Sequence, residues 1–180
     1  MGKKILVQRR GRGGRQFRAP SHKSMGEVKY INKTSDEAKN TITGTIKDLH
    51  HDPGRGAPIA LVKYQDKKTG LLLVPEGVAV GQTVIIGPEA PVAIGNVLPL
   101  NNIPEGTPIF NIEGRPLDGG KFVRTSGAYA TLMSIDEQKA TVKLPSGSLK
   151  TFNPLCRATI GIVAGGGRPE KPFVKAGTKY

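Results

Sequence analysis

Two apolar runs, Ile59-Ala-Leu-Val-Lys-Tyr64 and Leu71-Leu-Leu-Val74, flank the polar segment Gln65-Asp-Lys-Lys-Thr-Gly70. Each run is short, rich in aliphatic residues, and bounded by residues that are typical of turns. The segment between them has the length of a hairpin loop and ends in glycine. The sequence therefore predicts an antiparallel hairpin over residues 59–74.

Short strands of the same kind continue along the chain. Residues 129–135 and 140–144 predict a second hairpin around Asp136-Glu-Gln-Lys139, and a strand is expected over residues 41–49. The 24 glycines and 14 prolines argue against long helices. Many short strands at close spacing favour small closed barrels, because closure leaves no unpaired strand edge. We predict an all-β protein with a domain boundary near residues 77–87.

Positive charge is concentrated at the amino-terminal end. The 180 residues carry 27 Lys and Arg against 14 Asp and Glu, a net charge of +13, and residues 1–30 hold nine of the basic residues and one acidic residue. Such a charge indicates a polyanionic partner, nucleic acid first and an anionic membrane surface second. Because residues 1–30 have few apolar groups to pack, we expect them to be disordered in solution and ordered on RNA.

The sequence argues against a membrane-spanning or secreted protein. The longest charge-free stretch, residues 90–104, contains three prolines and three asparagines and is too short and too interrupted to span a bilayer. The single cysteine, Cys156, cannot form an internal disulfide, and no signal segment is recognisable. An intracellular, reducing setting fits, with Cys156 as a buried, inert thiol.

No catalytic or metal-binding template fits the chain. The segment Gly114-Arg-Pro-Leu-Asp-Gly-Gly-Lys121 has one residue too many for a phosphate-binding loop, and Gly165-Gly-Gly-Arg168 lacks the following helix of a dinucleotide site. The three histidines and one cysteine do not provide the four closed ligands of structural zinc. A metal pair at His50-His51 is a weaker reading than an ordinary strand-end pair. We expect no enzyme activity, no cofactor, no metal and no small-molecule substrate.

The segment His51-Asp-Pro-Gly-Arg-Gly-Ala-Pro58 lies between two predicted strands. Pro53-Gly54 sets a sharp turn that Asp52 can cap, and Gly56 has no side chain, so another backbone can approach there. We expect Arg55 at the apex, with its guanidinium fork free. These residues fit an ordinary turn with a solvated arginine as well as they fit a turn whose arginine contacts a phosphate. The basic ends of the chain favour the second interpretation, with RNA as the partner.

The chain contains a series of short motifs in a definite order. They are His51-Asp-Pro-Gly-Arg-Gly-Ala-Pro58, Glu76-Gly77, Gly81-Gln82, Gly95-Asn-Val-Leu-Pro99, Pro104-Glu-Gly-Thr107, Ser126-Gly127, Tyr129-Ala-Thr131, Lys143-Leu-Pro-Ser-Gly147, Gly165-Gly-Gly-Arg168 and Lys175-Ala-Gly177. This series closely resembles the family of large ribosomal subunit protein two, the L-two family, in its archaeal and eukaryotic form. The resemblance runs from the basic amino-terminal end to the last residue, and the order of so many motifs makes chance implausible.

The resemblance implies an arrangement of four parts. An oligonucleotide-binding-type barrel is expected over residues 38–80 and an SH3-like barrel over residues 81–160. Basic, irregular extensions are expected over residues 1–37 and 161–180. Family members continue through a further basic, histidine- and glycine-rich segment, so the resemblance implies that this chain lacks that carboxyl-terminal segment.

The resemblance also implies a function. The protein would be a non-enzymatic constituent of the large ribosomal subunit in the cytoplasm that binds large-subunit rRNA and supports subunit association, tRNA binding and the peptidyl-transferase region. Its partners would be large-subunit rRNA, neighbouring ribosomal proteins and the small subunit. A free-standing RNA-binding or translation-factor module is the alternative, since both barrel types occur there too. The RNA-binding residues expected are Arg9, Arg10, Arg12, Arg15, Arg18, Lys23, His51, Arg55, Gly56, Arg124, Arg157, Gly166, Arg168, Lys171, Lys175 and Lys179.

Overall fold

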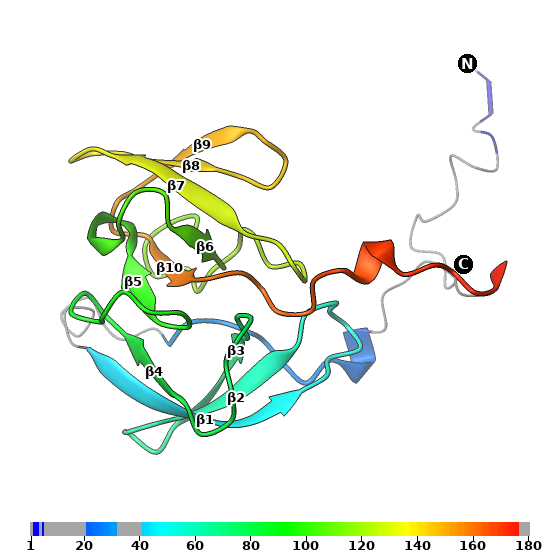
Figure 1. The fold of residues 1–180 in the computed structure, drawn as a ribbon, viewed down its shortest axis with the longest axis horizontal. Helices are drawn as coiled ribbons and strands as arrows, with labels where there is room; N and C mark the ends of the chain where they lie inside the picture. The colour runs from blue at the N-terminus through cyan, green and yellow to red at the C-terminus, as the bar shows by residue number, and fades with distance from the viewer. Residues whose placement is uncertain (1, 4, 6–20, 32–40, 177–180) are drawn as a thin grey trace.

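The computed structural model describes residues 2–3, 5, 21–31 and 41–176. Within these residues the regular structure consists of ten β-strands and three short 3-10 turns (Figure 1). The strands are β1 (Ile42–His50), β2 (Ile59–Tyr64), β3 (Thr69–Leu73), β4 (Thr83–Ile86), β5 (Val97–Pro99), β6 (Pro108–Phe110), β7 (Ala130–Ile135), β8 (Ala140–Lys143), β9 (Leu149–Phe152) and β10 (Arg157–Ile160). The 3-10 turns are η2 (Ser21–Lys23), η4 (Leu100–Asn102) and η5 (Arg168–Glu170).

The described strands form one continuous sheet. Its strand order is β3-β2-β1-β4-β5-β10-β6-β7-β8-β9, so β3 and β9 are the outer strands. Neighbours are antiparallel except β4 and β5, which pair in parallel through Ile86 and Val97. The all-β prediction is therefore confirmed, and the described strands of both expected barrels belong to a single sheet.

Both predicted hairpins are confirmed. In the first, β2 pairs with β3 from Ile59 opposite Leu73 to Lys63 opposite Thr69. In the second, β7 pairs with β8 from Thr131 opposite Lys143 to Ile135 opposite Ala140. The loops that were expected to reverse the chain therefore do so.

Two main hydrophobic clusters pack against the sheet. Burying one aliphatic side chain stabilises a fold by about 1.5–3 kcal/mol, so each cluster is a substantial core. The first cluster gathers around β1 to β4 and includes Tyr30, Ile42, Ile46, Val62, Tyr64, Val84, Ile86 and Val97. The second gathers around β5 to β10 and includes Leu98, Leu100, Ile109, Ile112, Leu132, Val142, Phe152 and Cys156.

A third, smaller cluster draws on residues far apart in sequence. Val28 packs there with Ile59 and Leu73 of the first hairpin and with Phe110 and Val163. Val28 is fully buried and Tyr30 is 2% exposed, so this part of the amino-terminal segment belongs to the core. The expectation of disorder throughout residues 1–30 is therefore wrong for Val28 and Tyr30, because Val28 packs in this third cluster and Tyr30 packs in the first. Residues 6–20 lie outside the described residues.

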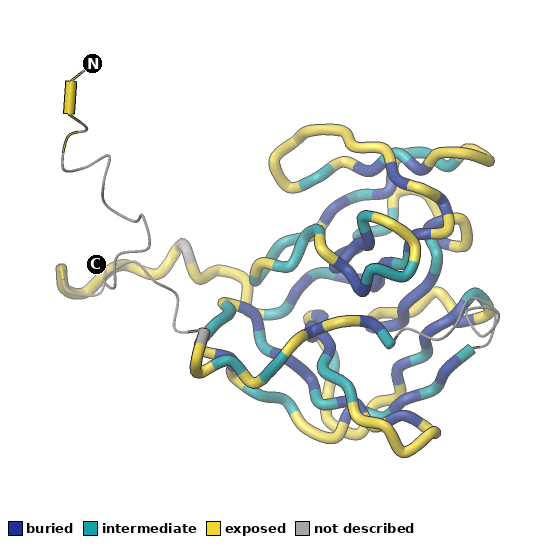
Figure 2. Tube along the Cα trace, turned by 180° about the vertical axis from the view of Figure 1, so that it is seen from behind, coloured by how far each residue is buried: buried dark blue, intermediate teal, exposed yellow. Residues whose placement is uncertain are grey.

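The expected division of the chain into four parts stays a prediction. Val84 and Ile86 of β4 pack in the first cluster, beyond the expected boundary at residue 80. At the carboxyl-terminal end, the chain after Ala164 is exposed wherever its burial is described (Figure 2). The turns η2 and η5 lie on the same side of the molecule (Figure 1), so the described parts of the two basic ends share one side. Among the described residues, no helix has the length and apolarity needed to cross a membrane.

Candidate nucleic-acid interface

The turn at residues 51–58 is built around a buried carboxylate. Asp52 is fully buried, and its Oδ1 accepts a hydrogen bond of 2.9 Å from the Gly54 N–H. Its Oδ2 accepts bonds of 3.0 Å from the Ser24 hydroxyl and 2.7 Å from Arg55 Nη1. Burial opposes ionisation, but these hydrogen bonds and the Arg55 charge outweigh it and lower the pKa of Asp52. The predicted cap of the turn is therefore confirmed.

Arg55 does not present a free guanidinium fork. Its Nη1 lies on Asp52, and its Nη2 donates a 3.0 Å hydrogen bond to the Gly26 carbonyl. The side chain is only 27% exposed. The expectation of a free fork is wrong because a buried carboxylate requires a cation beside it, and Arg55 is the cation within reach.

Arg124 is engaged in the same way. Its Nη1 donates a 2.9 Å hydrogen bond to the Gly120 carbonyl and its Nη2 a 2.8 Å bond to the Val28 carbonyl. Burial, together with the neighbouring positive charge of Arg55, lowers the pKa of this guanidinium. Both ends of the Arg124 fork are therefore directed at the protein backbone.

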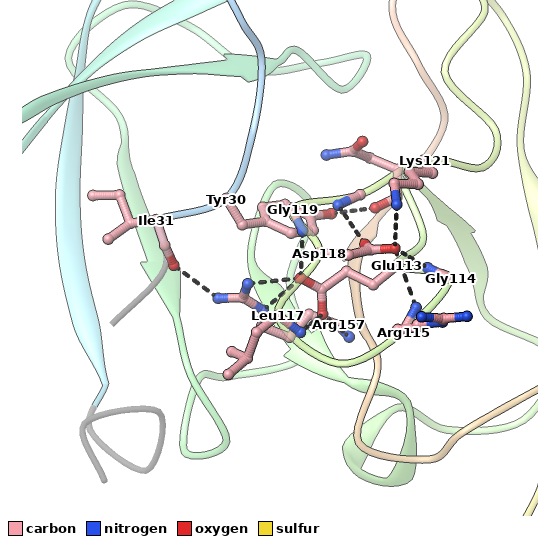
Figure 3. A network of polar contacts seen from close by, with 12 residues as sticks. Tyr30, Ile31, Glu113, Gly114, Arg115, Leu117, Asp118, Gly119, Lys121 and Arg157 are labelled. Atoms are coloured by element: carbon pink, nitrogen blue, oxygen red, sulfur yellow. Dashed lines mark hydrogen bonds and ion pairs between the residues drawn. The ribbon is translucent and has the colours of Figure 1, made fainter. Parts of the chain in front are cut away.

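Arg157 lies in a network of polar contacts that includes Tyr30, Glu113 and Asp118 (Figure 3). Its Nη2 and Nε donate hydrogen bonds of 2.6 and 3.1 Å to Glu113 Oε1, and the Glu113 side chain is fully buried. Its Nη1 donates a 3.0 Å bond to the Ile31 carbonyl. The guanidinium carbon also lies 5.2 Å from the centre of the Tyr30 ring, within cation–π range. The Arg157 side chain is 13% exposed, so it is a structural residue in this fold.

Two carboxylates fix the loop that follows β6. Glu113 also accepts hydrogen bonds from the N–H groups of Leu117 and Gly119, at 3.3 and 3.0 Å. Asp118 accepts from the N–H groups of Gly114, Arg115 and Gly120 and from Lys121 Nζ. The segment Gly114 to Lys121, which resembled a phosphate-binding loop by composition, therefore uses its N–H groups on its own acids (Figure 3).

The three arginines Arg55, Arg124 and Arg157, which we call the arginine clamp, share one target. They come from three places in the sequence, and each donates to a carbonyl between residues 26 and 31. Tyr30 adds a backbone bond of 3.1 Å to the Gly119 carbonyl and a hydroxyl bond of 2.8 Å to the Asn111 carbonyl. The clamp therefore holds residues 26–31 against the sheet.

An exposed surface lies beside this buried network. A Cβ added to Gly56 would overlap the Nη1 atom of Arg168, so the Arg168 guanidinium lies directly over Gly56. A Cβ on Gly127 would come within 2.7 Å of the Gly166 Cα, so these two backbones are in close contact. Gly56, Gly127, Gly166 and Arg168 thus form one surface, which we call the glycine–arginine surface.

This surface unites two predicted motifs that are more than a hundred residues apart in sequence. Glycines leave the backbone accessible, and an arginine fork matches phosphate geometry. Arg168 is exposed, and no hydrogen bond or ion pair of its side chain is recorded among the described residues. It is the arginine of the predicted set that offers its fork to solvent within the described part of the chain.

The remaining predicted residues divide into two groups. Lys23, His51, Lys171 and Lys175 are exposed, with Lys23 in η2 and Lys171 directly after η5. The others lie outside the described residues: Arg9, Arg10, Arg12, Arg15, Arg18 and Lys179.

Two further expectations concern Cys156 and metal binding. Cys156 is fully buried, as predicted, and burial, with the nearby Glu113 charge, raises the pKa of its thiol to about 11. In the part of the chain that the structure describes, no three His, Cys, Asp or Glu side chains gather as metal ligands.

Sequence reasoning missed the acceptors of the clamp. Glu113 follows an apolar run and its partner Arg157 is 44 residues away, so no local pattern connects them. The carbonyls of residues 26, 28 and 31 have no sequence signature at all. The one available signal was the apolar pair Val28 and Tyr30 inside the basic segment, which indicates a packed stretch.

The fold and this surface define a basic, all-β protein with an arginine-bearing exposed face. Two family profiles match the chain: "Ribosomal Proteins L2, RNA binding N-terminal domain" over residues 2–86 and "Ribosomal Proteins L2, C-terminal domain" over residues 93–180. The chain is 53% identical over all 180 residues to large ribosomal subunit protein uL2 of Methanothermobacter thermautotrophicus, and covers 75% of it. It is 54% identical to the uL2 protein of Methanocaldococcus jannaschii, of which it covers 74%. The chain belongs to the ribosomal protein L2 family, as the motif series indicated.

Proposed function

We propose that this protein is a structural constituent of the large ribosomal subunit that binds large-subunit rRNA. Its contribution is binding and positioning, without catalysis. Family membership and the net charge of +13 support an RNA partner. The expected ribosomal location agrees with the names of the relatives, and a cytoplasmic location is part of the proposal.

The observation that carries the proposal is the glycine–arginine surface. Arg168 lies over Gly56, and the backbones of Gly127 and Gly166 meet beside it without intervening side chains. A phosphate can approach such a surface closely, and the arginine fork can donate two parallel hydrogen bonds to it. Lys171 follows in the next turn and extends the positive surface.

The finer roles belong to the same proposal. Contacts with neighbouring ribosomal proteins, contact with the small subunit, support of tRNA binding and support of the peptidyl-transferase region would all require the body to be fixed on rRNA first. The arginine clamp contributes indirectly, because it fixes residues 26–31 and thereby sets where the basic segment leaves the sheet.

The proposal is tested by measuring the affinity of the full chain for a transcribed large-subunit rRNA domain at several salt concentrations. Arg168→Ala is compared with Lys68→Ala, which removes an exposed cation from the loop between β2 and β3. A hydrogen bond to a charged group contributes about 1.5–3 kcal/mol, so Arg168→Ala should weaken binding roughly tenfold to a hundredfold. It should also flatten the slope of log K against log salt by about 0.7–0.9.

The following results would contradict the proposal. Equal losses in both variants would mean that binding follows net charge rather than this surface. Absence of wild-type binding at moderate salt, or failure to co-sediment with large subunits, would remove the ribosomal role; washing off at moderate salt would favour a free-standing factor.

A further inference from the structure

Two motifs from the sequence, Tyr129-Ala-Thr131 and Lys143-Leu-Pro-Ser-Gly147, have no part in the surface described so far. The structure brings them together around a cavity of about 300 Å³. The residues that line it include Gly127, Tyr129, Thr131, Lys143, Pro145 and Gly147. No lining residue is acidic, and Lys143 supplies a positive charge.

The strand register explains why these side chains converge. Thr131 of β7 lies directly opposite Lys143 of β8, so the two side chains share one face of the hairpin. Tyr129 lies directly before β7 and lines the same cavity as Thr131 and Lys143. The turn after β8 is closed by hydrogen bonds of 2.9 Å from Leu144 N–H to the Ser148 carbonyl and 2.8 Å from Gly147 N–H to the Leu144 carbonyl. The cavity is thus held by a paired and hydrogen-bonded frame.

The cavity adjoins the glycine–arginine surface. Gly127 belongs to both, since it lines the cavity and meets the Gly166 backbone. The Gly127 N–H also donates a 2.9 Å hydrogen bond to the Val163 carbonyl, which ties this wall to the segment between β10 and η5. A ligand whose phosphate lies on Arg168 could therefore continue into the cavity.

Tyr129 gives the cavity its chemical character. Tyr129 is 48% exposed, whereas the other tyrosines within the described residues, Tyr30 and Tyr64, are each 2% exposed and belong to the core. An exposed aromatic ring beside a cation is the combination that binds an unstacked base and its phosphate. Small-ligand cavities span about 300–1,000 Å³, so this one is suited to a single small planar group.

We propose that this cavity binds one unstacked base of single-stranded RNA, with the base against Tyr129 and the adjoining phosphate at Lys143. This inference rests on the proposed function, and it adds a base-binding site to a surface that otherwise contacts phosphate. The protein therefore holds a looped-out nucleotide beside the helix or strand whose phosphates lie on Arg168.

The experiment uses the absence of tryptophan from the chain. In the Tyr129→Trp variant of the 180-residue chain the only indole lies at the cavity, so its fluorescence reports stacking. The probes are a ten-nucleotide oligoadenylate and an abasic ribose-phosphate oligomer of the same length. We expect the oligoadenylate to quench the fluorescence and the abasic oligomer to leave it unchanged. Stacking of one base should make the oligoadenylate bind roughly 5- to 150-fold more tightly.

Matched variants separate the cavity from general RNA binding. The control is Leu155→Trp, at a residue that is 62% exposed near the opposite end of the β7–β8 hairpin, and oligoadenylate should not quench it. Tyr129→Ala should abolish the preference for oligoadenylate over the abasic oligomer, and Tyr129→Phe should retain it. Binding of both oligomers with equal affinity by the wild-type protein would overturn the base site and leave the proposed function standing. If neither oligomer nor rRNA bound, the proposed function would fail as well.

Discussion

The arginine clamp and the glycine–arginine surface use the same side chain for opposite purposes. In the clamp, every fork ends on a carbonyl or a buried carboxylate. On the surface, Arg168 lies over a glycine and is exposed. The difference lies in the neighbours, because a buried acid or a backbone carbonyl without a partner recruits a guanidinium, whereas a glycine only makes room for one.

Because of this difference, only part of the positive charge of the protein is available to bind RNA. Three arginines expected to bind RNA are engaged within the fold, and two of them neutralise the buried acids Asp52 and Glu113. Their loss should lower stability first and RNA affinity only indirectly. The loss of Arg168 should do the reverse.

The largest effect is expected for Arg157→Met, which leaves Glu113 buried without its cation. Removing one partner of a buried ion pair costs about 3–5 kcal/mol. For a chain of this size, that corresponds to a fall in Tm of roughly 6–20 °C. Thermal unfolding followed by circular dichroism measures it, with Arg168→Met as the matched control. If both variants melted at the wild-type temperature, Arg157 would have no structural role.

A smaller loss is expected for Arg55→Ala. Asp52 would keep its bonds from Gly54 and Ser24 but lose a charged partner, at a cost of about 1.5–3 kcal/mol. Urea unfolding should show the loss, and Arg55→Lys should recover part of it because the charge remains. Affinity for rRNA, measured well below the melting temperature, should change less than for Arg168→Ala. A large loss of rRNA affinity with unchanged stability would mean that Arg55 contacts RNA directly and that its structural role is minor.

The pH dependence of stability should also show the contribution of Asp52, the carboxylate that pairs with Arg55 of the clamp. The pKa of Asp52 is lowered in the folded state, so its contribution is complete above its ordinary value and is lost as pH falls through the folded pKa. Wild-type stability should therefore decrease on acidification from about pH 5, and Asp52→Asn should flatten that decrease. Exposed Asp136→Asn is the control. Parallel pH profiles for wild type and Asp52→Asn would show that this carboxylate does not contribute.

Local patterns in the sequence predicted the strands well. The two hairpins follow from apolar runs with turn residues between them, and both the runs and the turns are local features. The cap of the turn by Asp52 was also predictable, since it spans only two residues. The meeting of Gly56 with Arg168 depends on the whole fold, although the motif series had already marked both segments.

The direction of each arginine could not be predicted from the sequence. Arg55 and Arg168 both follow glycine in glycine-rich segments, yet one is 27% exposed on a buried acid and the other is exposed. The difference arises because Gly26 and Asp52 approach Arg55 in the fold, and Gly26 comes from a segment that was expected to be disordered. The long-range packing of Val28 and Tyr30 therefore brings the carbonyl acceptors of residues 26–31 within reach of the clamp arginines.

The smallest effect is expected at Gly56, which follows the clamp residue Arg55 and lies under Arg168 of the glycine–arginine surface. In Gly56→Ala the new methyl group would meet Arg168 Nη1 and lie 3.3 Å from Ser126 Oγ. The end of an arginine side chain moves readily, so the variant should stay within about 0.5 kcal/mol of wild-type stability. Displacing Arg168 should weaken rRNA binding by roughly threefold to tenfold at matched salt. The double variant Gly56→Ala/Arg168→Ala should bind no more weakly than Arg168→Ala, because both changes remove the same contact. Additive losses, or a lowered melting temperature with unchanged affinity, would mean that Gly56 does not position this arginine for RNA.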